Sequence, residues 1–224
     1  MRHQLRPGSR ILVGLDVVMA GACAQASPAA VPSPTSVTSP PTTDRQAASV
    51  DLAALTIDDQ PAPRTPYRRE EWPTWVDIDG DGCDARSQAL IAQSLTPAQV
   101  VEPGCKVVAG DWRSPYDGVE TRDPSDLDAD HMVPLENVHQ SGGWQWDAAT
   151  RRAYANDQGV LVMVTAHANR SKGSSTPAEW RPALESDWCA YATQWVRLKV
   201  QWRLTATTRE RDALGQMLDT CAPD

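Results

Sequence analysis

The sequence predicts an α+β domain with a single core, and three observations support this class. Two short apolar runs, Cys105–Trp112 and Val160–Val164, have the length of strands and are separated by helix signals. The C-terminal part carries one helical stripe of large apolar residues, namely Trp188, Tyr191, Trp195, Leu198 and Trp202. The chain has 224 residues, of which 41% are hydrophobic, enough for one core and some unstructured chain.

The first 22 residues are predicted to be an export signal peptide. Three arginines precede the apolar run Ile11–Met19, which is too short to span a membrane. Two cleavage sites compete. Cys23 follows a stretch that resembles a lipoprotein box, so it could be lipidated and anchor the protein to a membrane. Ala24–Ala26 instead suits ordinary signal peptidase and would release a soluble secreted protein.

Residues 23–65 are rich in Ala, Pro, Ser and Thr, a composition that cannot bury a core. We therefore expect a disordered tether there and a folded domain over residues 66–224.

Within that domain, turn and capping residues mark the expected elements. Asp84, Pro134 and Asp147 are predicted to begin helices, and Thr207 with Glu210 forms a capping box. The elements expected in order are a helix over 85–94, strands over 105–112 and 119–121, helices over 135–140 and 148–155, a strand over 160–164, a helix over 166–171, and two C-terminal helices.

The cysteines of the domain predict two disulfides. The two C-terminal helices are expected to be antiparallel, which brings Cys189 at the start of one beside Cys221 at the end of the other. Cys83 then remains to pair with Cys105. Two disulfides suit an exported protein, and the absence of a Cys-x-x-Cys spacing argues against the alternative of a zinc site.

Charge is distributed unevenly along the chain. The formal net charge is −8. An acidic protein binds nucleic acid poorly in general, because contacts of basic residues with phosphates supply most non-specific affinity. From Cys23 to Thr150 there are 8 basic and 20 acidic residues, whereas from Arg151 to Asp224 there are 10 and 8. A bound polyanion should therefore lie on the downstream half.

One acidic loop resembles a calcium site. Asp77, Asp79 and Asp81 alternate before a glycine, as carboxylates do in calcium loops. Gln88 stands where an EF-hand would supply a bidentate Glu, so an ordinary polar turn is the alternative. A calcium-stabilised adhesion module is accordingly a third possible function.

The stretch Leu127–Leu135 carries the strongest chemical signal. It contains Asp128, Asp130 and His131 between short apolar residues. On a strand, the carboxylate of Asp130 and the adjacent imidazole face opposite ways, so one can hold a hard cation while the other takes a proton from water. The alternative is a solvated acidic loop beside a core histidine.

Further motifs follow in a fixed order. The segments Asp130–Leu135, Ala155–Asp157 and Asn169–Gly173 together resemble the HNH (ββα-metal) nuclease motif. More closely, the chain is similar from about Trp72 to Cys221 to secreted actinobacterial HNH-endonuclease-like proteins related to the C-terminal nuclease domain of GmrSD restriction enzymes. This resemblance implies a small ββα-metal centre with packed helices around it.

The resemblance also implies roles for individual residues. It makes His131 the general base and implies that a divalent cation, Mg²⁺ or alternatively Mn²⁺, is bound by carboxylate and amide oxygens. The implied metal ligands are Asp130, Asn169 and Asp128, the last directly or through water, and the implied phosphate-binding residues are Arg170 and Lys172. The implied substrate is nucleic acid, DNA rather than RNA, and no partner protein is implied.

One position departs from the motif. An Asn usually opens the second strand and orients the base histidine, but Val160 stands there in this chain. Asn156, a few residues upstream, is the candidate to replace it. If nothing orients His131, the alternative function is a catalytically weakened HNH-fold lipoprotein that acts as a surface binding module. His139 and His167 are expected at the surface or in packing.

Overall fold

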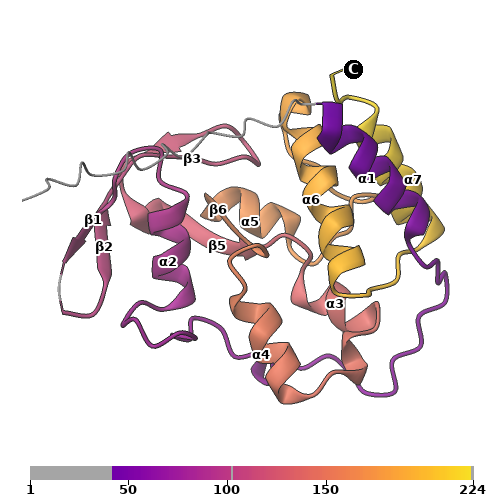
Figure 1. Cartoon of the computed structure of the whole chain (residues 1–224), viewed down its shortest axis with the longest axis horizontal. Helices are drawn as coiled ribbons and strands as arrows, with labels where there is room; N and C mark the ends of the chain where they lie inside the picture. The colour runs from indigo at the N-terminus through magenta and orange to yellow at the C-terminus, as the bar shows by residue number, and fades with distance from the viewer. Residues whose placement is uncertain (1–41, 102, 223–224) are drawn as a thin grey trace, which may run out of the picture. The chain divides into compact units, whose positions relative to one another are not determined.

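The structure, a computed structural model, describes residues 42–101 and 103–222 (Figure 1). These residues combine helices with three two-stranded antiparallel sheets, so the α+β class is confirmed. The predicted signal peptide and the lipidation site at Cys23 lie outside the described residues. Within the described ranges, no helix is long and apolar enough to cross a membrane.

Helices dominate the chain and the strands are short. The α-helices are α1 (Thr42–Ala54), α2 (Ala85–Ala92), α3 (Leu135–Gln140), α4 (Ala148–Asn156), α5 (Ala166–Lys172), α6 (Trp188–Gln201) and α7 (Thr208–Leu218). The strands are β1 (Gln99–Val101), β2 (Lys106–Ala109), β3 (Trp112–Arg113), β4 (Glu120–Thr121), β5 (Leu127–His131) and β6 (Leu161–Thr165). A short 3₁₀ turn, Arg69–Glu71, precedes α2.

The strand pair β5–β6 organises the site. The strands are antiparallel, with Asp130 opposite Val162 and His131 opposite Leu161. The chain passes from β6 directly into α5, whose N-terminus is capped by the Thr165 hydroxyl. Figure 1 shows α5 beside this pair.

Side-chain alternation gives the pair two different faces. Leu127 and Ala129 face a small core formed with α2 and β2. Val162 and Val164 face the larger core, which includes residues of α3, α4, α6 and α7. Asp128 and Asp130 alternate with the first pair of residues, so they point to the α5 side.

Local signals predicted most boundaries of these elements. Asp84 and Asp147 accept the capping hydrogen bonds expected of them, and the Thr207–Glu210 capping box is present. The predicted strand Cys105–Trp112 is instead divided into β2 and β3, because β2 pairs with β1 and β3 pairs with β4. The strand β1 was not predicted.

The predicted tether over 23–65 is wrong for its described part. Residues Thr42–Ala54 form α1, which packs against α6 and α7. Ala48 and Leu55 are buried in the larger core, and Ile57 forms a β-bridge with Ala206. Leu52 also packs against this core, so the folded domain begins before residue 66.

Both predicted disulfides are present in the structure. Cys189 and Cys221 join α6 to the end of α7, with a Cα–Cα distance of 4.9 Å. Cys83 and Cys105 join the start of α2 to the start of β2, with a Cα–Cα distance of 5.0 Å. One disulfide therefore connects α2 to β2, and the other connects the two C-terminal helices.

Candidate functional site

A pocket of about 320 Å³ lies at the end of β5 and brings together three of the predicted site residues. Asp130, His131 and Asn169 all line it, together with Arg69 and Trp75 from the segment before α2. Larger cavities of about 810 Å³ and about 420 Å³ lie elsewhere, along α6 and beside α7. Neither contains the Asp-His pair, so size does not identify the site.

The imidazole of His131 is held in one orientation. It is 8% exposed, and its Nε2 lies 3.0 Å from the carbonyl oxygen of Ala155. A carbonyl only accepts, so Nε2 carries the proton and Nδ1 is left with a lone pair. The rings of Trp75 and Tyr154 are stacked with the imidazole at centroid distances of 6.0 and 6.4 Å.

The environment also sets the charge of this imidazole. The pKa of His131 is lowered to about 4, chiefly by burial and to a smaller extent by the cations Arg69 and Lys172, while the hydrogen bond to the Ala155 carbonyl opposes this shift. His131 is therefore neutral at neutral pH, the state a general base requires.

Asp130 is buried on the α5 side of the strand. Its Oδ2 accepts a hydrogen bond from the Tyr116 hydroxyl at 2.7 Å and another from Lys172 Nζ at 2.7 Å. Burial raises the pKa of Asp130, while the charge and hydrogen bond of Lys172 lower it. Burial and Asp130 raise the pKa of Tyr116, so the phenol stays protonated as a donor.

The structure corrects the role implied for Lys172. Its side chain is fully buried, and Nζ donates to Asp130 and also to the carbonyl of His131 at 3.0 Å. An ammonium fixed beneath the strand cannot hold a substrate phosphate, so we assign Lys172 to positioning Asp130. Arg170, on the same helix, is exposed and forms no ion pair within the described part of the chain.

Asp128 and Asn169 lie in contact beside Asp130. Asn169 Nδ2 donates to Asp128 Oδ2 at 3.0 Å, and both side chains are half-buried. Asp128 is close enough to raise the pKa of Asp130 by repulsion, which a bound cation would relieve. Two carboxylates and one amide are hard oxygen donors, so the residues present fit Mg²⁺ or a similar ion.

Asn156 forms hydrogen bonds with backbone groups and none with His131, which corrects the orienting role expected of it. Its buried amide accepts from the Val76 N–H at 2.8 Å and donates to the Pro73 carbonyl at 2.8 Å. The group that orients His131 is the backbone carbonyl of the preceding residue, Ala155. The valine at position 160 therefore leaves the imidazole with an orienting partner, and Val160 itself is buried in the core.

Three contributors to the site were missed by sequence reasoning. Tyr116 and Trp75 reach the site from loops far upstream, and Arg69 reaches it from the short 3₁₀ turn. The only available signal was compositional: Trp75 stands in an aromatic-rich stretch before the acidic loop, and Tyr116 stands in a predicted turn. The hydrogen bond that His131 donates to the Ala155 carbonyl has no signature in the sequence, because every residue carries a carbonyl.

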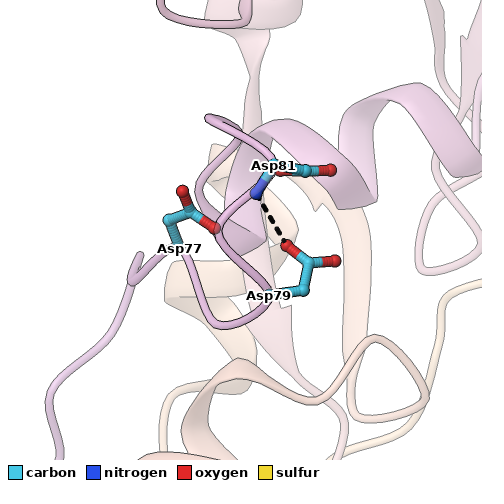
Figure 2. A group of neighbouring side chains, drawn as sticks. All are labelled: Asp77, Asp79 and Asp81. Atoms are coloured by element: carbon cyan, nitrogen blue, oxygen red, sulfur yellow. Dashed lines mark hydrogen bonds between the residues drawn. The ribbon is translucent and has the colours of Figure 1, made fainter.

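The acidic loop forms a compact cluster, separate from the pocket. Ligand atoms of Asp77, Asp79 and Asp81 lie within 4.8 Å of one another, as Figure 2 shows for the three side chains. Asp77 accepts from two backbone N–H groups of the loop at 2.7 and 3.0 Å. Gln88 donates to Asp79 and Asp81 from the position where a calcium loop would supply Glu. The calcium interpretation stays a prediction.

Comparisons with known proteins identify a family for this chain. The family model described as "GmrSD restriction endonucleases, C-terminal domain" matches residues 97–217. A protein from Arthroderma benhamiae named "Uncharacterized secreted protein" is 36% identical over 206 residues, which cover 91% of this chain and 97% of the relative. No solved structure matches the chain. The family indicates a nuclease-type function, and this chain belongs to the family of GmrSD restriction endonuclease C-terminal domains.

Proposed function

We propose that this protein is exported and hydrolyses phosphodiester bonds of nucleic acid by a metal-dependent, HNH-type mechanism at β5, β6 and α5. One observation carries the proposal: His131 is neutral and held through Nε2, and it lines the same pocket as Asp130 and Asn169. A base nitrogen next to hard oxygen ligands is the arrangement that metal-assisted phosphodiester hydrolysis needs.

Each residue has a defined task in this mechanism. Asp128, Asp130 and Asn169 would hold the cation, which would supply positive charge to the scissile phosphate and to the leaving oxygen. Nδ1 of His131 takes a proton from a water molecule, whose oxygen forms the new bond to phosphorus as the P–O bond to the leaving oxygen breaks. The leaving oxygen receives a proton from solvent. Arg170 is exposed on α5 and can pair with a phosphate oxygen.

A pKa of about 4 makes His131 a weak base in the free protein. Binding of a phosphodiester brings negative charge toward Arg69 and His131. This negative charge offsets the lowering of the His131 pKa by the neighbouring cations. The substrate itself would therefore raise the basicity of the imidazole. The ammonium of Lys172 lowers the pKa of Asp130 against the effect of burial, so it favours the ionised carboxylate that a cation needs as a ligand.

Export is supported by the two disulfides and by the secreted relative. A lipid anchor at Cys23 remains a prediction from the sequence. Mass spectrometry of the mature N-terminus would distinguish a lipidated Cys23 from an N-terminus created by ordinary signal peptidase.

A binding module without turnover is the second candidate, and the Asp130–Lys172 ion pair favours it. The ammonium already neutralises one of the carboxylates, which reduces the charge offered to a cation. This candidate predicts cation and nucleic-acid binding with no cleavage. The first candidate predicts both binding and cleavage.

Plasmid nicking tests the two candidates. The mature chain should retain α1, because Ala48 and Leu55 are buried in the core, and both disulfides should be formed. We would assay it with Mg²⁺, with Mn²⁺ and with a chelator, on DNA and on RNA. The matched variants are His131→Ala and His167→Ala, since His167 is exposed on α5 and does not line the pocket.

Metal-dependent cleavage that is lost in His131→Ala and retained in His167→Ala would support the enzyme. Equal cleavage by the wild type and His131→Ala would point to a contaminating nuclease and refute it. Binding without cleavage on either nucleic acid would leave the binding module.

A further inference from the structure

Trp75 combines backbone strain with an exposed ring. Its φ of 58° lies in the left-handed region, where a bulky residue is strained. The residue is 36% exposed, although the neighbouring Trp72 is completely buried. Burial in the core therefore does not explain why a tryptophan is held in this conformation.

Two polar side chains fix the loop that carries this ring. Asn156, which is 5% exposed, bonds to the backbone of Pro73 and Val76 at 2.8 Å each. On the other side, the guanidinium of Arg69 donates to the Trp72 carbonyl at 2.6 Å and to the Thr74 hydroxyl at 3.0 Å. The loop is thus preorganised, with the Trp75 ring lying 6.0 Å from the imidazole of His131.

Arg69 presents a positive charge at the same pocket. It is exposed and has no carboxylate partner at ion-pair distance among the described residues. It is also close enough to His131 to lower the pKa of that imidazole. A fixed arginine and a fixed aromatic ring therefore line one pocket beside the proposed base.

We propose that Trp75 and Arg69 together bind one nucleotide of an unpaired strand, the base stacked on the Trp75 ring and a phosphate held by Arg69. The reason is that a base inside a duplex is covered by its neighbours, whereas a single strand offers its faces to aromatic side chains. This inference rests on the proposed function and names its substrate class as single-stranded nucleic acid. Both residues lie outside the matched residues 97–217. The segment before α2 therefore contributes pocket-lining residues that the matched family region does not include.

Binding to an abasic strand tests the stacking directly. Fluorescence anisotropy would compare a labelled DNA 12-mer with an abasic 12-mer of equal charge, in chelator so that neither is cut. Trp75→Gly accepts a φ of 58° without strain and removes the whole side chain, including the indole ring. It should weaken binding of the intact strand by roughly 5- to 150-fold, the range for loss of one stacked base, and leave the abasic strand unchanged. Trp75→Phe should retain most of the affinity.

The arginine has a different signature. Arg69→Gln should weaken binding of both strands and reduce the salt dependence of the affinity by about 0.7 per lost phosphate contact. Arg122→Gln is the matched control, because Arg122 is exposed, pairs with Asp111 and does not line the pocket. Its binding should equal that of the wild type. Thermal melting of each variant verifies that the domain is folded.

The outcomes separate this inference from the proposed function. Equal effects of Trp75→Gly on the intact and abasic strands, or no effect on either, would overturn the stacking, even if the protein cleaves DNA. Base-dependent binding that Trp75→Gly removes would support the inference, even if no cleavage is found. Preferential binding of a hairpin duplex over the single strand would also overturn it.

Discussion

Removing the Lys172 ammonium should destabilise the domain and disable the site together. Nζ lies 2.7 Å from Asp130 Oδ2, and neither side chain is more than 8% exposed. Breaking a buried ion pair by removing one partner costs about 3–5 kcal/mol, because the remaining charge is left without compensation. Asp130 keeps one donor, Tyr116, and lines a pocket that admits water. We therefore expect Lys172→Met to cost about 3 kcal/mol, at the lower end of that range.

The partner substitution separates charge from packing. In Asp130→Asn with Lys172→Met no buried charge remains, so the double variant should be more stable than the sum of the single effects by about 2 kcal/mol or more. Cleavage should be lost in all three variants. A protonated Asp130 or an amide at that position is a poorer ligand for a hard cation.

Urea denaturation followed by tryptophan fluorescence, without reductant, would measure these differences. The matched control is Arg170→Met, which removes a positive charge from the exposed side of the same helix and should change stability by less than about 0.5 kcal/mol. A Lys172→Met variant as stable as this control would refute the reasoning. The ammonium would then not be held by Asp130 and would be free to bind phosphate, as the family resemblance had implied.

Three further predictions concern pH, the loop clamp and a disulfide. The pKa of His131 is about 4 when folded and 6.5 ordinarily, so the unfolded chain takes up the proton first and stability should fall by about 3 kcal/mol between pH 6.5 and 4. Thermal melts in chelator should show a weaker dependence in His131→Gln, and equal slopes would contradict this assignment. Asn156→Ala leaves backbone groups of the Trp75 loop without hydrogen-bond partners, so it should lower the free energy of unfolding in urea by about 1–3 kcal/mol. It should also weaken binding of intact DNA but not of abasic DNA. Unchanged binding of intact DNA would show that Asn156 does not hold the loop in place. Replacing Cys189 and Cys221 by Ala opens a loop with a sequence separation of 32, so it should cost about 4 kcal/mol in the same denaturation assay. The cleavage rate per folded molecule should not change. A loss of cleavage activity larger than the fraction of unfolded protein would argue against this prediction.

Local sequence signals were sufficient for most secondary structure. Caps such as Asp84 and Asp147 specify where helices begin because the bonds they form lie within one turn. The same local reading failed at α1, because this helix is stabilised by packing of residues such as Ala48 against α6 and α7 rather than by its own sequence. It also missed β1, because a three-residue strand depends on its partner for stability.

The sequence by itself determined the order of the motifs, and with it the meeting of Asp130, His131 and Asn169 at one pocket. Only a few arrangements are open to two paired strands and a helix that follows the second strand directly. Residues at the ends of these elements therefore come together.

Only the tertiary structure decided what surrounds these residues. Three of the contacts are long-range in the sequence. They are the buried ion pair of Lys172 with Asp130, the hydrogen bond of His131 to the Ala155 carbonyl, and the hydrogen bond between Asn156 and Val76, which are 80 positions apart. Each depends on how whole elements pack and on backbone groups that every residue shares. Residue identity and spacing therefore could not reveal them.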